Sequence, residues 1–184
     1  LEMVSSSVDR LLVVVNEVLD VSRIETGELL IETEDFNLKE SLDHDLYVLN
    51  LAARKKDISL TCTIAPEVPA YVHGDPARLV QILTNLVNNG IKYTDQGAIS
   101  LIIENCGYDN TNTFRLRFIV KDTGCGIAQE KLELISHYFK QKATPSVSMP
   151  LSVGTTGLGL TVSSQLVKLM GGEIGVESGS GGST

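Results

Sequence analysis

The hydrophobic residues of the first 20 positions repeat at alternating intervals of three and four, the a/d pattern of coiled coils and helix bundles. This seam consists of Leu1, Val4, Val8, Leu11, Val15 and Val18. Leu12 and Leu19 widen the stripe, and neither glycine nor proline interrupts it before Gly27. The narrow stripe favours a helix that pairs with other helices over one that packs on its own domain, so we expect dimerisation or a further helix as its partner.

Beyond Gly27 the pattern switches between the strand period of two and the helix period of 3.6. The predicted strands are 29–36, 58–64, 98–104, 114–121 and 173–177. The predicted helices are 38–56, 75–93 and 157–170. Residues 123–156 have no regular pattern, which is typical of a functional or mobile loop. This mixture of helices and hairpin-connected strands predicts an α+β fold, a two-layer sandwich with helices on one face of the sheet.

Composition places the chain among globular proteins of one domain, or of one domain with an appendage. It has 184 residues, of which 42% are hydrophobic and 21% charged, which excludes disordered, collagenous and disulfide-rich classes. The longest apolar run, 11–15, is far shorter than the roughly 20 residues of a membrane helix. Three scattered cysteines, Cys62, Cys106 and Cys125, indicate a reducing compartment, so we expect a cytoplasmic domain whose parent protein can be membrane-anchored.

The net charge of −8 is concentrated at one end of the chain. Residues 1–35 contain nine acids and two bases, whereas the remaining 149 residues contain 14 acids and 13 bases. The sum argues against nucleic acid as a partner. The nearly neutral body does not oppose the binding of a nucleotide.

The helix predicted from Asp75 carries an unusual polar face. Its residues fall within a sector of about 80° at 100° per residue. They are Arg78, Gln81, Asn85, Asn89 and Lys92. Asparagine is a poor helix former, so its repetition here lowers the stability of the helix, which a face that is only exposed to solvent gives no reason for. Amide oxygens one turn apart suit a hard cation such as Mg²⁺, and a lysine one turn further can reach a phosphate oxygen.

Two glycine-rich clusters follow this helix. In 122–127, Asp122 ends a predicted strand and can accept from an exocyclic amine, while Gly124 and Gly126 let a flat ring approach the backbone. The second cluster, 154–160, opens the last helix, where backbone amides bind anions. It is neither a Walker loop nor a dinucleotide fingerprint, because no Gly-Lys-Ser/Thr follows and no strand precedes it.

These clusters, in this order and with a long loop between the last two, resemble the ATP-binding region of a sensor histidine kinase. Residues 81–94 resemble the N box, 122–127 the first glycine box and 154–160 the second. Residues 18–27 are similar to the exit of the second dimerisation helix in hybrid-type kinases, and 179–183 to the glycine turn before the last strand of the family. The resemblance implies the Bergerat (GHKL) fold shared with gyrase, mismatch-repair and chaperone ATPases, with a mixed sheet.

The resemblance also implies roles for individual residues, with ATP and Mg²⁺ as cofactors. Asn85 and Asn89 would hold magnesium and the phosphates, Lys92 would contact phosphate, Tyr93 would flank the nucleotide, and Asp122 would bind the adenine amine. The two glycine boxes would complete the site with Gly124, Gly126, Ile127, Thr156, Gly157, Leu158, Gly159 and Leu160. Residues 128–156 would form the ATP lid. The reaction would transfer the γ-phosphoryl group to a histidine, mainly by positioning and charge neutralisation.

The sequence departs from the family pattern in four places. Gly90 replaces the usual alanine of the N box, Ser136 replaces one aromatic residue of the Phe-rich box that keeps Phe139, and Thr155 replaces a glycine. The phosphoacceptor box is absent. None of the three histidines has its sequence context, and we assign structural roles to His44, His73 and His137.

We therefore expect the acceptor helix to precede Leu1, with 1–28 forming part of a dimerisation domain and 29–184 forming the ATP-binding domain without its last strand. The implied partners are ATP, the phosphoacceptor helix, a response-regulator receiver domain and a second copy through the N-terminal helix, with no nucleic acid. Two alternatives stay open, a GHKL-type ATPase and a regulatory, pseudokinase-like nucleotide-binding module. Asn85 argues against the ATPase, because such ATPases carry a general-base glutamate there and an amide cannot take a proton.

Overall fold

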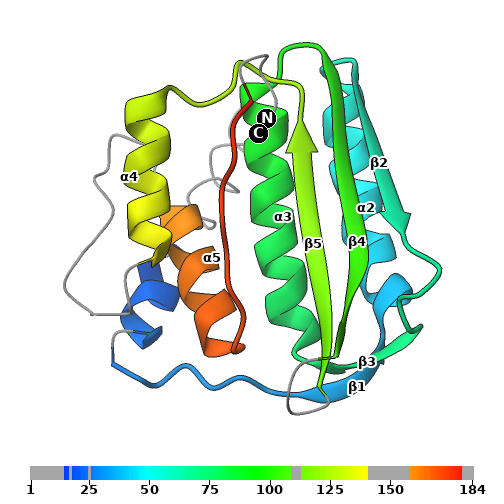
Figure 1. Ribbon diagram of the computed structural model, residues 1–184, viewed down its shortest axis with the longest axis vertical. Helices are drawn as coiled ribbons and strands as arrows, with labels where there is room; N and C mark the ends of the chain where they lie inside the picture. Colours follow the sequence, from blue (N-terminus) through cyan, green and yellow to red (C-terminus); the bar gives the residue numbers. More distant parts are fainter. Residues whose placement is uncertain (1–14, 17, 25, 109–112, 141–157, 180–184) are drawn as a thin grey trace, which may run out of the picture.

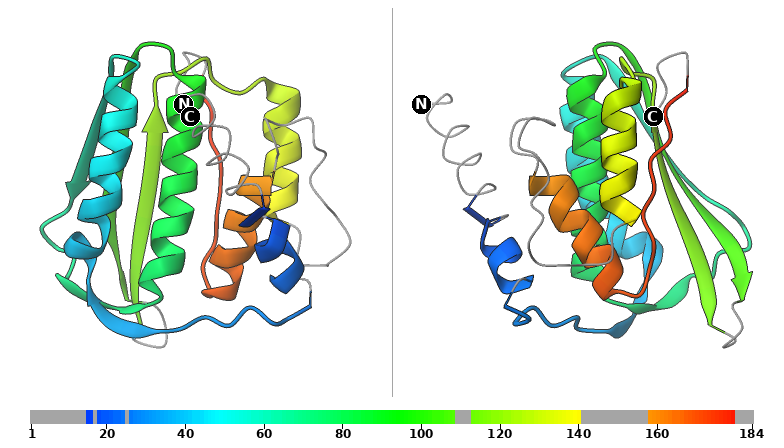
Figure 2. Two further views of the ribbon diagram at one scale, coloured as in Figure 1. Left: turned by 180° about the vertical axis from the view of Figure 1, so that it is seen from behind. Right: turned by 60° about the vertical axis from the view of Figure 1, so that its left-hand side comes forward.

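The computed structural model describes residues 15–16, 18–24, 26–108, 113–140 and 158–179. Two layers are visible, with the helices on one face of a sheet (Figures 1 and 2). In chain order the elements are β1 (Glu34–Asn37), α2 (Leu38–Arg54), β2 (Ile58–Ile64), β3 (Tyr71–Gly74), α3 (Pro76–Tyr93), β4 (Gly97–Tyr108), β5 (Phe114–Asp122), α4 (Gln129–Lys140) and α5 (Leu158–Leu169).

The main sheet is mixed, as expected. Its order is β2-β4-β5, with β2 parallel and β5 antiparallel to the central β4. A separate two-stranded antiparallel sheet is formed by β1 and β3. The α+β sandwich with helices on one face is confirmed.

The core lies between this sheet and the helices α2 and α3. Alternate residues of β4, Ile99, Leu101 and Ile103, are fully buried, which is the period-two signature of a strand covered on one face. They pack against Leu83 and Val87 of α3 in two adjoining clusters that also include α2. The helix α3 is therefore held rigidly against the centre of the sheet.

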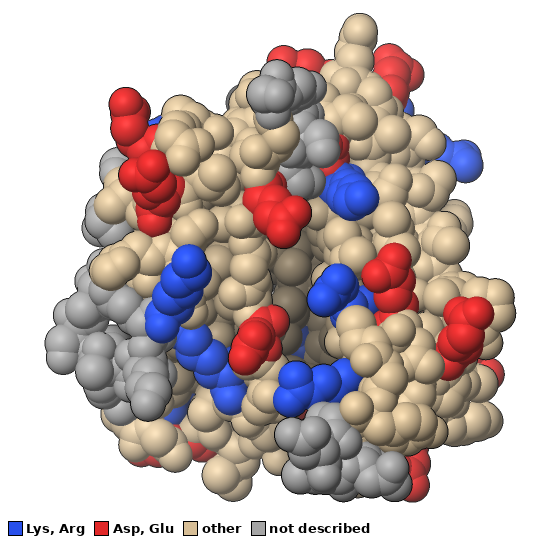
Figure 3. Space-filling model, in the orientation of Figure 1, with Lys and Arg blue, Asp and Glu red and all other residues tan. Residues whose placement is uncertain are grey.

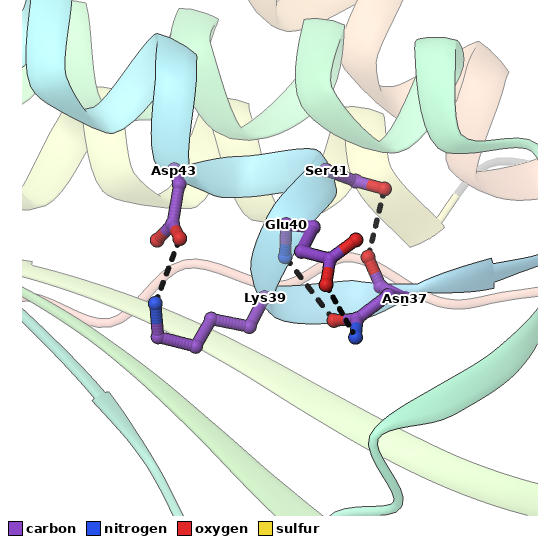
Figure 4. Close-up of polar contacts among 5 residues, drawn as sticks. All are labelled: Asn37, Lys39, Glu40, Ser41 and Asp43. Carbon is purple, nitrogen blue, oxygen red and sulfur yellow. Dashed lines mark hydrogen bonds and ion pairs between the residues drawn. The ribbon is translucent and has the colours of Figure 1, made fainter.

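The beginning of α2 shows why the sequence starts a helix at this point (Figure 4). The side chain of Asn37 accepts a hydrogen bond from the backbone N–H of Glu40 and donates to its carboxylate, each at 3.2 Å. The first contact satisfies one of the backbone donors that the first turn of a helix leaves unpaired, and the second joins the two side chains. The Oγ of Ser41 donates to the carbonyl of Asn37 at 2.9 Å, and Lys39 pairs with Asp43 at 2.7 Å.

The N-terminal segment is helical at 15–16 and 18–24 within the described residues. Val21 and Ile24 pack on this chain's own domain, in a cluster with Ile82 of α3 and two residues of α5. Packing on the own domain, the less favoured interpretation, thus holds for this end of the segment. Val15, Val18 and Leu19 are 44%, 50% and 48% exposed, so the predicted seam has no cover here, and its pairing with another helix stays a prediction.

Four sequence expectations are wrong in detail. The strand predicted at 29–36 is confined to β1, because the backbone N–H of Glu32 is bound by the side chain of Asp75 and not by a neighbouring strand. The segment after Pro69, for which the pattern predicts neither a strand nor a helix, contains β3. Its residues reach a strand conformation by pairing with β1, far away in the sequence.

The other two errors concern the second half of the chain. Residues 129–140, expected to be irregular, form the helix α4 and bury Ile135 and Phe139. Residues 173–177 carry no strand, and only Gly179 makes an isolated bridge. Ile174 and Val176 nevertheless pack in the cluster around Phe139, and the segment runs beside β5 (Figure 1).

Within the described part of the chain, none of the helices has the length and hydropathy required to cross a membrane. Cys62, Cys106 and Cys125 are all free and exposed.

Candidate functional site

The site is built on α3, whose start is fixed by local chemistry as the sequence predicts. The side chain of Asp75 accepts from the backbone N–H of Arg78 at 3.0 Å through one oxygen, and from that of Glu32 at 3.0 Å through the other. Pro76 occupies the first turn, where its missing N–H is harmless. Asp75 is 4% exposed, so its cap is a buried, charge-assisted one.

The polar face of α3 divides into two parts with different partners. At its N-terminal end, Nε2 of Gln81 donates to Asp20 at 2.6 Å, and Nη1 of Arg78 donates to Oε1 of Gln81 at 2.8 Å. Asp20 is 9% exposed, and its other oxygen lies 3.8 Å from Arg78. This part of the face therefore binds the N-terminal helix and is not available to a ligand.

The next polar residue, Asn85, contacts the beginning of α5. Its Nδ2 donates to Oγ of Ser163 at 2.8 Å. A Cβ added to Gly159 would meet the carboxamide of Asn85, with Nδ2 at 2.7 Å and Cγ at 2.9 Å. Because Nδ2 is used by Ser163, the carboxamide presents Oδ1 as an acceptor or ligand beside the first turn of α5.

The C-terminal end of α3 meets the end of β5. The carbonyl of Tyr93 accepts from the backbone N–H of Cys125 at 3.3 Å, and Oδ1 of Asp122 accepts from the backbone N–H of Gly124 at 2.8 Å. A side chain at Gly124 would collide with the carbonyl of Tyr93 and with Oδ1 of Asp122, so this junction requires glycine. Gly90 lies against β5 as well, since a Cβ added there would be 3.6 Å from Cβ of Asp122.

Two exposed side chains project from the last turn of α3. Nζ of Lys92 lies 3.0 Å from the hydroxyl of Tyr93 and 4.6 Å from the centre of its ring, a cation–π arrangement. Asn89 is half-buried, and no hydrogen bond holds its amide among the described residues. Asn89 and Lys92 therefore lie on the part of α3 where the sequence predicts contacts with magnesium and phosphate.

The remaining predicted site residues have mixed outcomes. Gly126 has a φ of +70°, in the left-handed region that favours glycine, and directs the chain toward α4. The side chains of Ile127 and Leu160 pack in the hydrophobic cluster of Ile135 and Phe139, so only their backbones could face a ligand. Leu158 is half-buried. Thr155, Thr156 and Gly157, together with 141–154 of the expected lid, lie outside the described residues.

The structure thus gathers two groups on one helix. Asn85 meets α5, while Tyr93, with Lys92 beside it, meets the loop after β5. Lys92 follows Asn85 by seven positions on α3, or about 10 Å along the axis. Among the described residues, no three His, Cys, Asp or Glu side chains lie close enough to hold a metal ion. A metal here would depend on amide oxygens and on oxygens of the ligand.

Sequence reasoning missed the partners of the polar face. Ser163 is fully buried on α5, beside Ser164 and Thr161, and these small polar residues allow α5 to approach α3 closely. The grouping of these small polar residues within four positions of one helix was the available signal. No sequence signal indicated the role of Asp20, because its partner Gln81 is 61 residues away in the sequence.

With this geometry described, comparisons with known proteins identify the family. The family model of histidine kinase-, DNA gyrase B-, and HSP90-like ATPases matches residues 74–184, which contain α3, β5 and both glycine boxes. The chain therefore belongs to this family.

Its relatives narrow the class to sensor histidine kinases. The chain is 38% identical over 177 residues to the sensor histidine kinase GacS of Pseudomonas protegens, covering 95% of this chain and 19% of that protein. It is 38% identical over 178 residues to the signal transduction histidine-protein kinase BarA of Escherichia coli K12, covering 97% and 19%. The chain thus spans about a fifth of these relatives and corresponds to their ATP-binding catalytic domain of the GHKL type.

A solved structure agrees. Full-length ShkA in complex with AMPPNP superimposes with a TM-score of 0.75 at 28% identity, covering 97% of this chain and 35% of that one. This coverage of nearly the whole chain supports the Bergerat-type fold.

Proposed function

We propose that this domain binds Mg-ATP and transfers its γ-phosphoryl group to a histidine on a dimerisation helix. The observation that carries the proposal is the contact of Asn85 with Ser163 and Gly159. It fixes a carboxamide oxygen beside the N-terminus of α5, where backbone amides favour phosphate. The resemblance to ShkA, which was crystallised in complex with AMPPNP, supports the same ligand class.

In this proposal adenine lies at the junction of α3 and β5. Oδ1 of Asp122 is held by the amide of Gly124, which leaves the other carboxylate oxygen to accept from the exocyclic amine. Gly124 lies against the backbone of Tyr93, and a side chain there would fill the space next to the carboxylate. Tyr93 is 43% exposed at this junction and would flank the nucleotide.

The phosphates would extend along α3 from Lys92 toward Asn85. The donor set fits magnesium, because the amides of Asn85 and Asn89 are the oxygen ligands that this ion accepts together with phosphates and water. When bound, magnesium would neutralise phosphate charge. Lys92 would leave the Tyr93 ring to contact a phosphate oxygen, and Gly159 would let the backbone of α5 approach.

The chemical step breaks the bond from the γ-phosphorus to the oxygen that bridges it to the β-phosphate. A bond forms from phosphorus to an imidazole nitrogen, and ADP leaves. His44 and His137 are exposed on α2 and α4, and His73 is paired with Asp35 at 2.8 Å. We propose that none of them is the acceptor, and that a helix N-terminal to the seam supplies the histidine and a receiver domain takes the phosphoryl group onward.

The alternatives differ in what happens to the phosphoryl group. An ATPase needs a general base at the position of Asn85, whose amide cannot accept a proton. A regulatory module would bind nucleotide without transfer.

On the face shown in Figure 3, basic and acidic side chains are interspersed around a central hollow, so no field of one sign opposes an anionic ligand there.

The test has two stages. Affinity for an ATP analogue, with and without Mg²⁺, should fall at least about tenfold in Asp122→Asn and in Asn89→Ala, which is about 1.4 kcal/mol each. Binding that is unaffected by Asp122→Asn would overturn the site. The chain is then extended to include the preceding acceptor helix and incubated with γ-labelled ATP. Label on histidine would indicate a kinase, and release of free phosphate would indicate an ATPase. If the nucleotide binds but neither product forms, the domain is a regulatory module.

A further inference from the structure

The last turn of α3 has an unusual set of partners for its carbonyl groups. The final carbonyls of a helix have no partner within it. Here the carbonyl of Gly90 accepts from the backbone N–H of Thr94 at 3.0 Å, and that of Tyr93 accepts from Cys125. This leaves the carbonyls of Ile91, Lys92 and Thr94.

A single side chain, Lys56, reaches all three of these oxygens. Its Nζ donates to the carbonyl of Ile91 at 2.7 Å and lies 3.4 Å and 3.5 Å from those of Lys92 and Thr94. A cation at this place also interacts favourably with the negative end of the helix dipole. The contact joins segments that are 35 to 38 residues apart in the sequence.

The backbone around Lys56 directs its side chain toward α3. Its N–H donates to the carbonyl of Ala53 at 2.9 Å, which continues the last turn of α2. Asp57, the next residue, has a φ of +57°, in the left-handed region that a non-glycine residue seldom adopts. This sharp turn leads into β2 at the buried Ile58 and leaves Lys56 beside the end of α3.

We propose that Lys56 is a positioning residue for the nucleotide site. It touches no ligand; it fixes the turn that carries Lys92 and Tyr93 and that faces Asp122 across Gly124. Without Lys56, three carbonyls lose a charged donor and the last turn of α3 frays. The backbone that carries the side chains of Lys92 and Tyr93 is then no longer held in place. This inference rests on the proposed nucleotide site and adds a residue from α2 that does not belong to any of the three boxes.

The test compares Lys56→Met with Lys56→Arg and with a matched control, Lys55→Met. Lys55 is the neighbouring exposed lysine and has the same charge. Analogue affinity is measured by calorimetry at a temperature where denaturation curves show every variant to be folded. We expect Lys56→Met to bind about fivefold to tenfold more weakly, Lys56→Arg within about twofold of the wild type, and Lys55→Met unchanged.

A second readout separates positioning from simple destabilisation. In the transfer reaction, Lys56→Met should raise the KM for ATP by the same factor while kcat stays within about twofold, because chemistry on bound nucleotide is unchanged. Wild-type affinity in Lys56→Met, or an equal loss in Lys55→Met, overturns the inference and leaves the site intact. Failure of the wild-type chain to bind the analogue overturns the proposed function itself.

Discussion

The contact of Gly159 with Asn85 allows a substitution that separates binding from stability. In Gly159→Ala the new Cβ would come closest to Oδ1 of Asn85 and would stand 2.7 Å from its Nδ2, whereas ordinary van der Waals contact begins at 3.4 Å. The carboxamide must therefore retreat by up to about 1 Å, and its hydrogen bond to Ser163 is lost or distorted. Because the obstacle is the end of a flexible side chain, the fold can accommodate the change.

The free energy of unfolding and the free energy of analogue binding are expected to respond differently to this substitution. Loss of one hydrogen bond costs about 0.5–1.5 kcal/mol, and replacing glycine by alanine inside a helix returns about 0.8–1 kcal/mol. The free energy of unfolding should change by less than about 1 kcal/mol. Affinity for the ATP analogue should fall at least about tenfold, because the displaced carboxamide oxygen of Asn85 can no longer contact the bound magnesium or phosphate in the required geometry.

The assay is calorimetric titration with an ATP analogue, together with urea denaturation of the same samples. Gly175→Ala is the matched control, because a Cβ there has nothing within 4 Å. In an Asn85→Ala background the effect of Gly159→Ala should disappear, since the carboxamide that it displaces is gone. An undiminished effect in that background would show that the alanine acts on the ligand directly, and wild-type affinity in the single variant would refute the role of Asn85.

Three further outcomes are expected. Asp75→Ala should lower the free energy of unfolding by about 2–3 kcal/mol in urea denaturation, because two backbone donors lose a buried carboxylate; a loss below about 0.5 kcal/mol would contradict the cap. Asp20→Ala should release the N-terminal helix, so that hydrogen exchange of 18–24 accelerates while that of β4 does not; equal protection in both proteins would contradict the contact with Gln81. Although Cys62 is exposed as a residue, partial burial raises the pKa of its thiol, and Asp43 raises it further, so alkylation of this cysteine should reach its midpoint at a higher pH than that of a free thiol; Asp43→Asn should move the midpoint down, and an upward shift would contradict the assignment.

The start of α3 and the two-layer fold were predictable because their signals are local. Asp75 followed by proline defines a helix start from its own chemistry, and alternation around Ile99 defines a buried strand. By contrast, β3 exists because of its pairing with β1, which lies 34 to 40 residues earlier in register, and a segment of four residues has no pattern of its own.

The helix α4 had a signal that was not used. Leu132, Ile135 and Phe139 recur at helical spacing, but the glycine-rich and serine-rich surroundings led to the prediction of an irregular loop. The candidate site shows the same limit. The residues proposed to face the ligand were predicted from residue type and spacing. Ser163 and Lys56 make their contacts with residues 78 and 35 positions away in the sequence, which spacing cannot indicate.

The division of the apolar interior into separate clusters has a consequence for how the molecule opens. Two clusters join the sheet to α2 and α3. A third packs α5 and the N-terminal segment on α3, and the fourth joins α4, the start of α5 and the C-terminal segment. Smaller clusters open at lower free energy than the global transition, so α4 and α5 should form a cooperative unit that exchanges its amide hydrogens before the sheet does. A ligand that touches both Asn85 and the beginning of α5 binds only the closed form. Nucleotide should therefore slow exchange in α5 far more than in β4, and the domain would couple occupancy to the order of one half of its structure.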